Sequence, residues 1–232
     1  MGVTELARRV DLLPSDVHRI LNSLATYGFI EQNPVNKTYR LGIGVMKLGL
    51  ATFQRNELRE AARSVLQRLS EEADATAHLA IFDAHELDTF LTDQLDAAGD
   101  VPFKPSYGAV APPNCTALGK VIAANIERSI ALELVRRHGL TKATARTITS
   151  LPTLEAEWDR IRLQGYAVDL EETAEGACCI GAPVLDWSGS AAAAISISMP
   201  ATRFARYPES QLAALVKRAA AELSAAAGQR VM

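Results

Sequence analysis

The sequence predicts an α+β protein in which a small helical head precedes a larger domain built on an antiparallel sheet. Two observations support this prediction. The first fifty residues contain two short amphipathic helical patterns followed by two strand-like runs. From residue 75 onward, strand-like and helical patterns follow one another in an order typical of helices packed on antiparallel strands. The length of 232 residues accommodates two domains.

Composition and cysteine content place the chain among globular intracellular proteins. Hydrophobic residues make up 48% and charged residues 22% of the sequence, which excludes a disordered, collagen-like or fibrous chain. No apolar run approaches the roughly 18 residues of a transmembrane helix, and residues 1–5 lack the pattern of a signal peptide. The three cysteines include the adjacent pair Cys178 and Cys179 and cannot form a disulfide framework. We therefore expect a cytoplasmic protein with reduced thiols and no membrane partner.

Charge is distributed unevenly along the chain. Residues 1–50 carry six basic and four acidic side chains, whereas the remainder carries 18 basic and 23 acidic side chains. A mildly basic head on an acidic body is compatible with a nucleic-acid-binding head joined to a sensing or assembling domain. Differences of this size are also common in proteins that bind no nucleic acid, so the charge alone leaves both classes open.

Two helices are predicted at the start of the chain. Thr4 is a candidate N-cap of the first helix, whose apolar stripe consists of Leu6, Ala7 and Val10. Pro14 suits the first position of the second helix, where its missing N–H costs nothing, and Gly28 suits the residue that ends it. The apolar face of the second helix repeats at i, i+3, i+4 and i+7 and consists of Val17, Ile20, Leu21 and Leu24. Two such helices joined by a tight turn have the dimensions of a helix-turn-helix.

A hairpin is predicted directly after the second helix. Strand-like runs at Phe29–Gln32 and Thr38–Leu41 flank a turn-rich stretch at residues 33–37. A hairpin in this place makes the head a winged helix-turn-helix, whose second helix enters the major groove of double-stranded DNA. DNA contacts are then expected from Ser15, His18, Arg19, Asn22 and Ser23 on the helix and from Lys37 and Arg40 on the wing. The pattern alone also allows a small helical subdomain with a solvated polar face.

The larger domain is predicted to combine helices with antiparallel strands. A connecting helix at residues 45–51 and an amphipathic helix at residues 57–73 lead into it. Ala77–Phe82 and Leu87–Leu95 have the pattern of a hairpin. Further helices are expected at Thr116–Ala124, Ile126–Arg137, Leu154–Leu163 and Pro208–Ala227, and further strands at Tyr166–Leu170, Cys179–Asp186 and Ala192–Ser198.

Four runs in the head resemble a known family. They are Val3–Arg9, Pro14–Leu24, Tyr27–Gln32 and Tyr39–Gly42. Together they are similar to the winged-helix head of IclR-type bacterial transcriptional regulators. The resemblance implies specific DNA binding, and it implies one more helix before this region, so that the first helix of the head is expected to be missing here. Asp16 stands where the family usually has Ser or Thr; an acidic side chain suits a helix N-terminus but repels phosphate, and we expect no phosphate contact from it.

The resemblance extends through the larger domain. Its anchors are Pro113–Lys120, Gly165–Glu172, Gly176–Val184 and Ala194–Ser198. It implies a GAF-like effector-binding domain, and with it a DNA-binding domain at residues 1–44, a linker helix at residues 45–56 and an effector-binding and oligomerisation domain at residues 57–232. It also implies that the chain associates with itself, as a homodimer or as a dimer of dimers, with the linker helix available to pair with its twin.

The larger domain also contains a candidate ligand site. Ser196 and Ser198 are two residues apart on a predicted strand, so both hydroxyls face one side and need partners there. The helix start at residues 117–119 offers free N–H groups to an anion. By resemblance, the effector contacts fall on Ala117, Leu118, Asp169, Cys179, Ser196 and Ser198. We expect the effector to be a small organic acid or an aromatic metabolite, although the serines could instead bond to the backbone and Cys179 could fill the core.

Enzymatic and metal-binding interpretations are disfavoured. The four histidines and three cysteines show no spacing that links them, and the sequence has no G-x-S-x-G, Walker A or H-E-x-x-H pattern. Adjacent carboxylates such as Glu171 and Glu172 point to opposite faces of a strand and are usually solvated. We therefore expect no enzyme, metal or cofactor, but a DNA-binding transcriptional regulator modulated by a small molecule. The alternative is a protein-interaction or small-molecule sensor module that does not bind DNA specifically.

Overall fold

The computed structural model describes residues 1–54, 57–96 and 106–228 and contains two compact units. The first unit spans Met1–Glu57 and the second spans Leu58–Met232. Within the described ranges, no helix is both long enough and apolar enough to cross a membrane.

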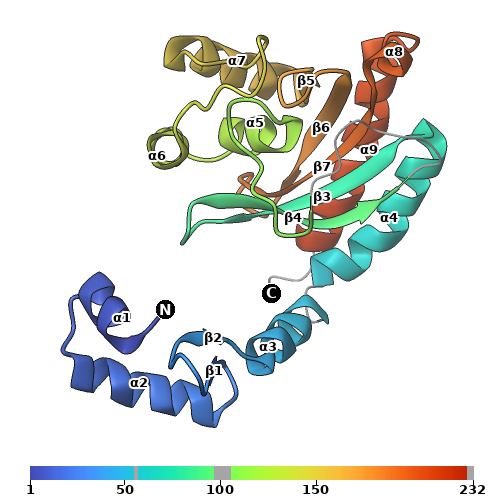
Figure 1. Ribbon diagram of the computed structural model, residues 1–232. Helices are drawn as coiled ribbons and strands as arrows, with labels where there is room; N and C mark the ends of the chain where they lie inside the picture. Colours follow the sequence, from blue (N-terminus) through green and yellow to red (C-terminus); the bar gives the residue numbers. More distant parts are fainter. Residues whose placement is uncertain (55–56, 97–105, 229–232) are drawn as a thin grey trace. The chain divides into compact units, whose positions relative to one another are not determined.

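The first unit is a helix-turn-helix followed by a hairpin and a further helix (Figure 1). Its elements are α1 (Val3–Val10), α2 (Pro14–Thr26), β1 (Ile30–Gln32), β2 (Tyr39–Leu41) and α3 (Ile43–Gln54). The two strands pair in antiparallel register, with Glu31 opposite Arg40. Pro14 occupies the first turn of α2, as predicted. The arrangement confirms the predicted winged helix-turn-helix.

The core of the first unit is small. Ala7 of α1 and Val17 and Leu21 of α2 are buried against one another and against partly buried neighbours from both strands. Two residues of the predicted apolar face, Ile20 and Leu24, are not buried, with exposed fractions of 46% and 36%. Both lie at the margin of the apolar stripe, where nothing in the described residues covers them.

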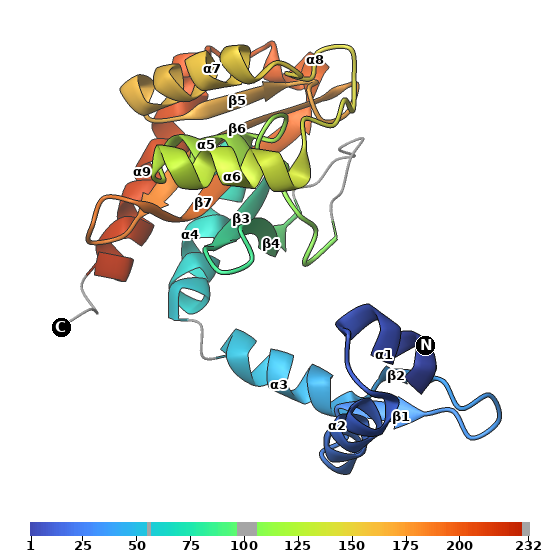
Figure 2. The ribbon, with the colours of Figure 1, turned by 90° about the vertical axis from the view of Figure 1, so that its left-hand side faces the viewer.

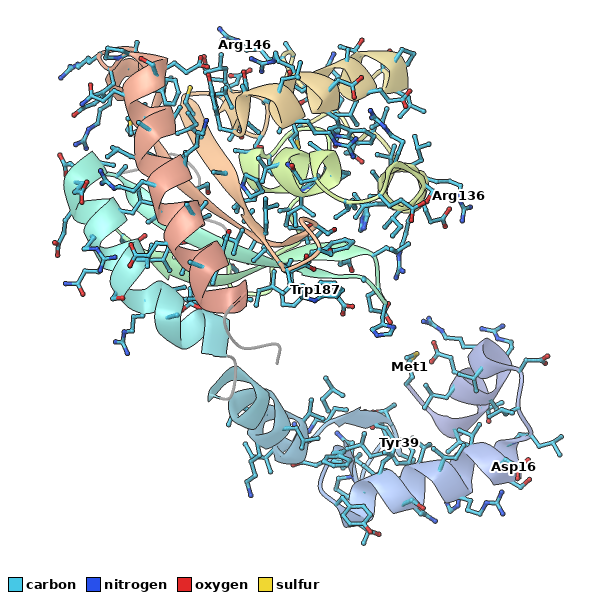
Figure 3. The ribbon with its side chains drawn as sticks, turned by 180° about the vertical axis from the view of Figure 1, so that it is seen from behind. Met1, Asp16, Tyr39, Arg136, Arg146 and Trp187 are labelled. Carbon is cyan, nitrogen blue, oxygen red and sulfur yellow. The ribbon has the colours of Figure 1, made fainter. Side chains whose placement is uncertain are left out.

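Backbone contacts close the first unit on itself. Gly28 adopts a φ of +71°, which glycine tolerates, and it reverses the chain directly after α2. The amide of Gly44 donates to the carbonyl of Gly28 at 2.8 Å, and a Cβ on Gly44 would lie only 2.7 Å from that oxygen. At the other end of the hairpin, the Tyr39 amide donates to the Met1 carbonyl at 2.8 Å (Figure 3). The start of α3 is therefore bonded to the end of α2, and the hairpin is bonded to the first residue of the chain.

The second unit is built on a five-stranded sheet in which every neighbouring pair is antiparallel (Figure 2). The strand order is β4-β3-β7-β6-β5. Its strands are β3 (Thr76–Asp83), β4 (Asp88–Leu95), β5 (Ala167–Leu170), β6 (Ala177–Leu185) and β7 (Ala191–Pro200). The helices from this part of the chain are α4 (Glu57–Ala73), α5 (Ala117–Ala124), α6 (Arg128–His138), α7 (Leu151–Gln164), α8 (Ala201–Phe204) and α9 (Glu209–Gly228).

Helices cover both faces of this sheet (Figures 1 and 2). Helices α4 and α9 pack on one face, where Leu66 and Val216 meet strand residues such as Ile195. Helices α5, α6 and α7 lie over the other face, where Ile122 and Trp158 are completely buried. Successive residues of a strand point to opposite faces, so each strand contributes to both cores.

The observed elements confirm the α+β class predicted from the sequence. Each predicted helix and strand of the larger domain is present, with ends shifted by a few residues, and the short helix α8 was not anticipated. The predicted cap of the first helix is wrong. Gly2 occupies the N-cap position, and Thr4 is the second residue of α1, two residues beyond the cap.

Gly119 is expected to be a sensitive position of the second unit. A Cβ at Gly119 would lie 2.3 Å from the Pro112 carbonyl oxygen, a backbone atom that cannot step aside. We expect Gly119→Ala to lower the free energy of unfolding by about 1–3 kcal/mol, measured by urea denaturation followed by circular dichroism. Gly49→Ala on α3 is the matched control, because a Cβ there meets no atom of the described residues within 4 Å. Equal stability of the two variants would contradict the expectation.

Candidate functional sites

The polar face of α2 gathers the residues predicted to contact DNA. Five of them are exposed on the side of α2 opposite the buried Val17 and Leu21 (the recognition face): Ser15, His18, Arg19, Asn22 and Ser23. The other two, Lys37 and Arg40, are exposed on the hairpin that follows. The structure thus brings the helical set onto one face and the remaining two onto the wing.

Both arginines in this set already have acidic neighbours. Arg19 contacts Asp16 at 3.4 Å, and Arg40 contacts Glu31 at 2.7 Å. The two arginine side chains are 80% and 78% exposed. Exposed ion pairs of this kind contribute only about 0–1 kcal/mol, so a phosphate or a base edge can replace the carboxylate. Asp16 therefore restrains Arg19 without burying it, and Arg19 stays exposed on the recognition face.

A cavity of about 460 Å³ opens in the second unit between the sheet and the start of α5. Strands, the α5 N-terminus and residues 106–112 all contribute to its wall. The six residues predicted to contact an effector all line it: Ala117, Leu118, Asp169, Cys179, Ser196 and Ser198. These residues come from four separate elements, so the fold itself assembles them.

Strand register explains why the polar residues of the sheet meet at this cavity. Ser198 lies opposite Cys179 on β6, and Cys179 lies opposite Asp169 on β5. One register step away, Ser196 lies opposite His78 on β3. Directly opposed residues in an antiparallel sheet point to the same face. The register therefore aligns one polar side chain from each of four strands along the cavity wall.

The N-terminus of α5 faces the same cavity. Thr116 is the N-cap, and its Oγ1 accepts the Gly119 amide at 2.9 Å. The amides of Ala117 and Leu118 have no acceptor among the described residues, as is usual in a first helical turn. They lie at the positive end of the helix and can donate hydrogen bonds to a ligand oxygen.

Among the described residues that line the cavity, Asp169 is the one carboxylate, and it is only 2% exposed. Burial raises its pKa, while hydrogen bonds from Thr173 and Glu172 and the nearby Lys120 charge oppose the rise. Its Oδ1 accepts the Glu172 amide at 2.7 Å and the Thr173 amide at 3.3 Å. Much of its hydrogen-bonding capacity thus goes to shaping the loop that follows β5.

The two thiols that line the cavity, Cys115 and Cys179, are kept in their protonated, unreactive form by burial. Burial raises the pKa of Cys115 to about 11 and that of Cys179 well above its ordinary value. Both remain protonated at neutral pH, whereas a nucleophilic cysteine needs its thiolate form. Within the described residues, no cluster of three or more His, Cys, Asp and Glu side chains could hold a metal ion.

Lys120 is a structural residue that sequence reasoning missed. It follows the first turn of α5 and is completely buried. Its Nζ donates to the Val168 carbonyl oxygen at 2.5 Å. The same Nζ donates to both carboxylate oxygens of Glu172 at 2.7 Å and lies 3.5 Å from Oε1 of Glu157 on α7. The expectation that Glu172 is a solvated surface carboxylate is therefore wrong, because its side chain is 12% exposed and paired with Lys120.

His78 is the second residue that was missed. It lines the cavity, is 4% exposed, and its Nε2 lies 2.8 Å from Ser198 Oγ. Burial lowers the pKa of His78 to about 4, and the charge of Asp96 offsets only part of that shift. The available signal was a lone polar residue in an apolar strand pattern, the same signal that had pointed to Ser196.

The Ser196 hydroxyl remains without a hydrogen-bond partner among the described residues. Ser196 lines the cavity on the same strand as Ser198. The alternative that both serines bond to the backbone therefore does not describe Ser196, and a ligand or water in the cavity can bond to its hydroxyl.

Comparison with known proteins identifies the family. Residues 50–225 match "Bacterial transcriptional regulator IclR C-terminal", and residues 1–34 match "IclR helix-turn-helix domain". The chain belongs to the IclR family of bacterial transcriptional regulators. The resemblance noted in the sequence is thereby confirmed, and the chain is a DNA-binding transcriptional regulator.

Relatives match this IclR-family chain over most of their length. The HTH-type transcriptional regulator KdgR of Escherichia coli K12 is 32% identical over 228 residues, which cover 98% of this chain and 86% of that protein. The regulator BhcR of Paracoccus denitrificans is 34% identical over 224 residues, covering 97% and 80%. The crystal structure of Thermotoga maritima IclR superposes with a TM-score of 0.73 at 27% identity, covering 98% of this chain and 91% of that one. These relatives are transcriptional regulators, which confirms the prediction that the chain is not an enzyme.

The buried His78 predicts a specific pH dependence of stability. The unfolded chain protonates this imidazole near its ordinary pKa of 6.5, whereas the folded protein does so only at about 4. The unfolded state therefore binds more protons between these values, and stability contributed by neutral His78 is complete above pH 6.5 and is lost as the pH falls toward 4. Relative to His78→Phe, we expect the wild type to lose about 3 kcal/mol across that window.

Urea denaturation of both proteins at several pH values measures this difference. Other titrating groups cancel when the two curves are subtracted. Parallel curves for wild type and His78→Phe would contradict the prediction.

Proposed function

We propose that this regulator reads an operator in double-stranded DNA with the recognition face and the wing, and that a small effector in the cavity modulates this binding. The effector is a small organic acid or an aromatic metabolite. The observation that carries the proposal is the cavity itself, in which the unpartnered Ser196 hydroxyl and the free amides at the start of α5 converge. The predicted effector contacts are the six cavity residues named above.

On DNA, the residues divide by their chemistry. Arg19 and Asn22 are suited to hydrogen-bond base edges in the major groove, while Lys37 and Arg40 are suited to phosphates. His18 shares a hydrogen bond with Asn22 at 3.2 Å, so the two side chains are held side by side on the recognition face. The Ser23 hydroxyl donates to the Arg19 carbonyl, which leaves its lone pairs available.

The regulator acts as a homodimer or as a dimer of dimers in this proposal. A two-fold pair of heads reads two half-sites of a partly palindromic operator. The helix α3 supports self-association because four of its apolar residues are 38–56% exposed: Ile43, Val45, Met46 and Leu48. A second copy of the same helix would cover them. The cytoplasm, where the chromosome lies, is the compartment that fits this role.

Effector control requires two arrangements of the regulator with different effector affinities. An effector that bound both arrangements equally would shift nothing, however tightly it bound. The same free-energy difference sets how strongly the effector changes operator affinity. The competing candidate is a sensor or interaction module without specific DNA binding.

Salt dependence separates these candidates. Fluorescence anisotropy of the full chain with DNA from upstream of its own gene gives the affinity at increasing salt. Specific binding that falls steeply as salt rises, with weaker binding to scrambled DNA, supports the regulator. Binding with no preference over scrambled DNA would favour the sensor module.

Arg19→Ala is expected to weaken operator binding by about 1–3 kcal/mol, because a base contact is lost. The same anisotropy assay measures it. Arg136→Ala on α6 (Figure 3) serves as the matched control, since Arg136 is 76% exposed and its ion-pair partner among the described residues is its neighbour Glu133. Wild-type affinity for the Arg19 variant would remove this residue from the contact set.

Changes in the cavity are expected to alter the effector response and to leave DNA affinity in the absence of effector unchanged. Ser196→Ala removes the unpartnered hydroxyl, and Cys179→Leu fills part of the cavity. The readout is the concentration of added organic acid that changes operator binding by half. An equal loss of DNA binding and effector response would indicate misfolding instead, which thermal unfolding checks directly.

A further inference from the structure

His78 and Ser198 form a hydrogen-bonded pair inside the cavity wall. The distance between His78 Nε2 and Ser198 Oγ is 2.8 Å, and both residues are at most 4% exposed. His78 lies on β3 and Ser198 on the neighbouring β7, so the pair bridges two strands at the centre of the sheet. His78 Nδ1 has no hydrogen-bond partner among the described residues.

The position of the ring proton decides what Ser198 can offer to a ligand. A neutral imidazole carries one N–H and one lone pair. If Nε2 carries the proton, it donates to Ser198 Oγ, and the unpartnered Nδ1 is an acceptor. If Nδ1 carries the proton, a buried N–H is left without an acceptor, which is rarer in proteins than an unsatisfied acceptor. The surroundings of Nδ1 therefore favour the proton on Nε2.

With the proton on Nε2, Ser198 Oγ accepts from His78 and its own proton must point elsewhere. No described residue other than His78 hydrogen-bonds to this hydroxyl. The direction left open is the cavity that Ser198 lines. The Ser198 hydroxyl then joins the amides of Ala117 and Leu118 as a donor on the cavity wall.

We propose that His78 is a positioning residue that fixes Ser198 as a hydrogen-bond donor, so that the cavity selects ligands presenting acceptor oxygens. This inference rests on the proposed effector site. His78 acts through Ser198 and need not touch the ligand itself. Without the imidazole, the hydroxyl can rotate to donate or to accept, and the selection is lost.

Burial makes this arrangement independent of pH in the neutral range. The pKa of His78 lies at about 4, so the ring holds a single proton at pH 7. Among the described residues, the charge of Asp96 favours the protonated ring, and the same cavity is lined by the carboxyl of Asp169 and the neutral thiols of Cys115 and Cys179. Gln94 is the cross-strand neighbour on β4 and carries no charge.

The tautomer can be observed directly in the full chain. Nitrogen-15 NMR of the histidine rings separates a protonated from an unprotonated ring nitrogen, and His78→Phe identifies the His78 signals among the four histidines. We expect Nε2 protonated and Nδ1 unprotonated, unchanged between pH 6 and pH 8. The opposite tautomer would overturn the inference.

Ligand selection is tested with matched probes that differ in one group. Benzoate presents two acceptor oxygens, and benzamide replaces one of them with an NH₂ donor; acetate and acetamide form a smaller pair. Calorimetric titration of the wild type is expected to favour the carboxylates, and His78→Phe is expected to reduce that preference about tenfold. His78→Gln keeps an N–H donor at about the reach of Nε2 and should restore the preference. His85→Phe in the exposed turn after β3 is the matched control and should leave it unchanged.

A double-mutant cycle shows whether His78 acts through Ser198. The effects of His78→Phe and Ser198→Ala on carboxylate preference should be far from additive, because each removes the same directed hydroxyl. Additive effects, or an unchanged preference in His78→Phe, would overturn the role of His78 while leaving the effector site intact. Failure of every probe to bind the wild type would instead overturn the proposed effector site, and the inference with it.

Discussion

The buried ammonium group of Lys120 is the constraint on which the architecture of the second unit depends. It bonds the β5 backbone at Val168, the loop after β5 through Glu172, and approaches Glu157 on α7. Removing one partner of a buried ion pair leaves an uncompensated charge, which costs several kcal/mol. These three elements and α5 are therefore fixed relative to one another, and the loop that carries Thr173 is fixed with them as one wall of the cavity.

The carboxylates around Lys120 respond differently to the same burial. Burial alone would raise the pKa of Glu157, but hydrogen bonds from Arg160 and the Lys120 charge lower it overall. For Glu172, burial outweighs the attraction of Lys120 and raises the pKa. The pKa is therefore lowered for Glu157 and raised for Glu172, although the two side chains are similarly buried, at 13% and 12% exposed. The network supports the cavity from behind, and Lys120 does not line it.

The sequence predicts the parts of this site that depend on local periodicity. The two-residue spacing of Ser196 and Ser198 fixes their shared face in any strand, and Thr116 at the start of a helical pattern fixes the orientation of the α5 amides. Lys120 and His78 were not predictable in the same way, because their roles depend on partners 48 and 120 residues away in the sequence. A lysine in an apolar helix looks like a surface residue until the fold brings β5 and α7 against it. In the head, the apolar spacing places Ile20 on the same face as Val17 and Leu21, but whether it is buried depends on what packs above it.

The proposed effector site offers hydrogen-bond donors and no counter-charge. No Lys or Arg of the described residues lines it. Burial lowers the pKa of His78 and raises the pKa of Asp169, and both shifts favour the neutral form of the side chain. In the proposed site an anionic effector would therefore be held by amide and hydroxyl donors, each worth about 1.5–3 kcal/mol toward a charged group. A rearrangement that withdraws one such donor changes effector affinity by about one to two powers of ten. That is the size of a typical allosteric coupling free energy, so small displacements of α5 relative to β7 would be sufficient to couple the cavity to a second state of the regulator.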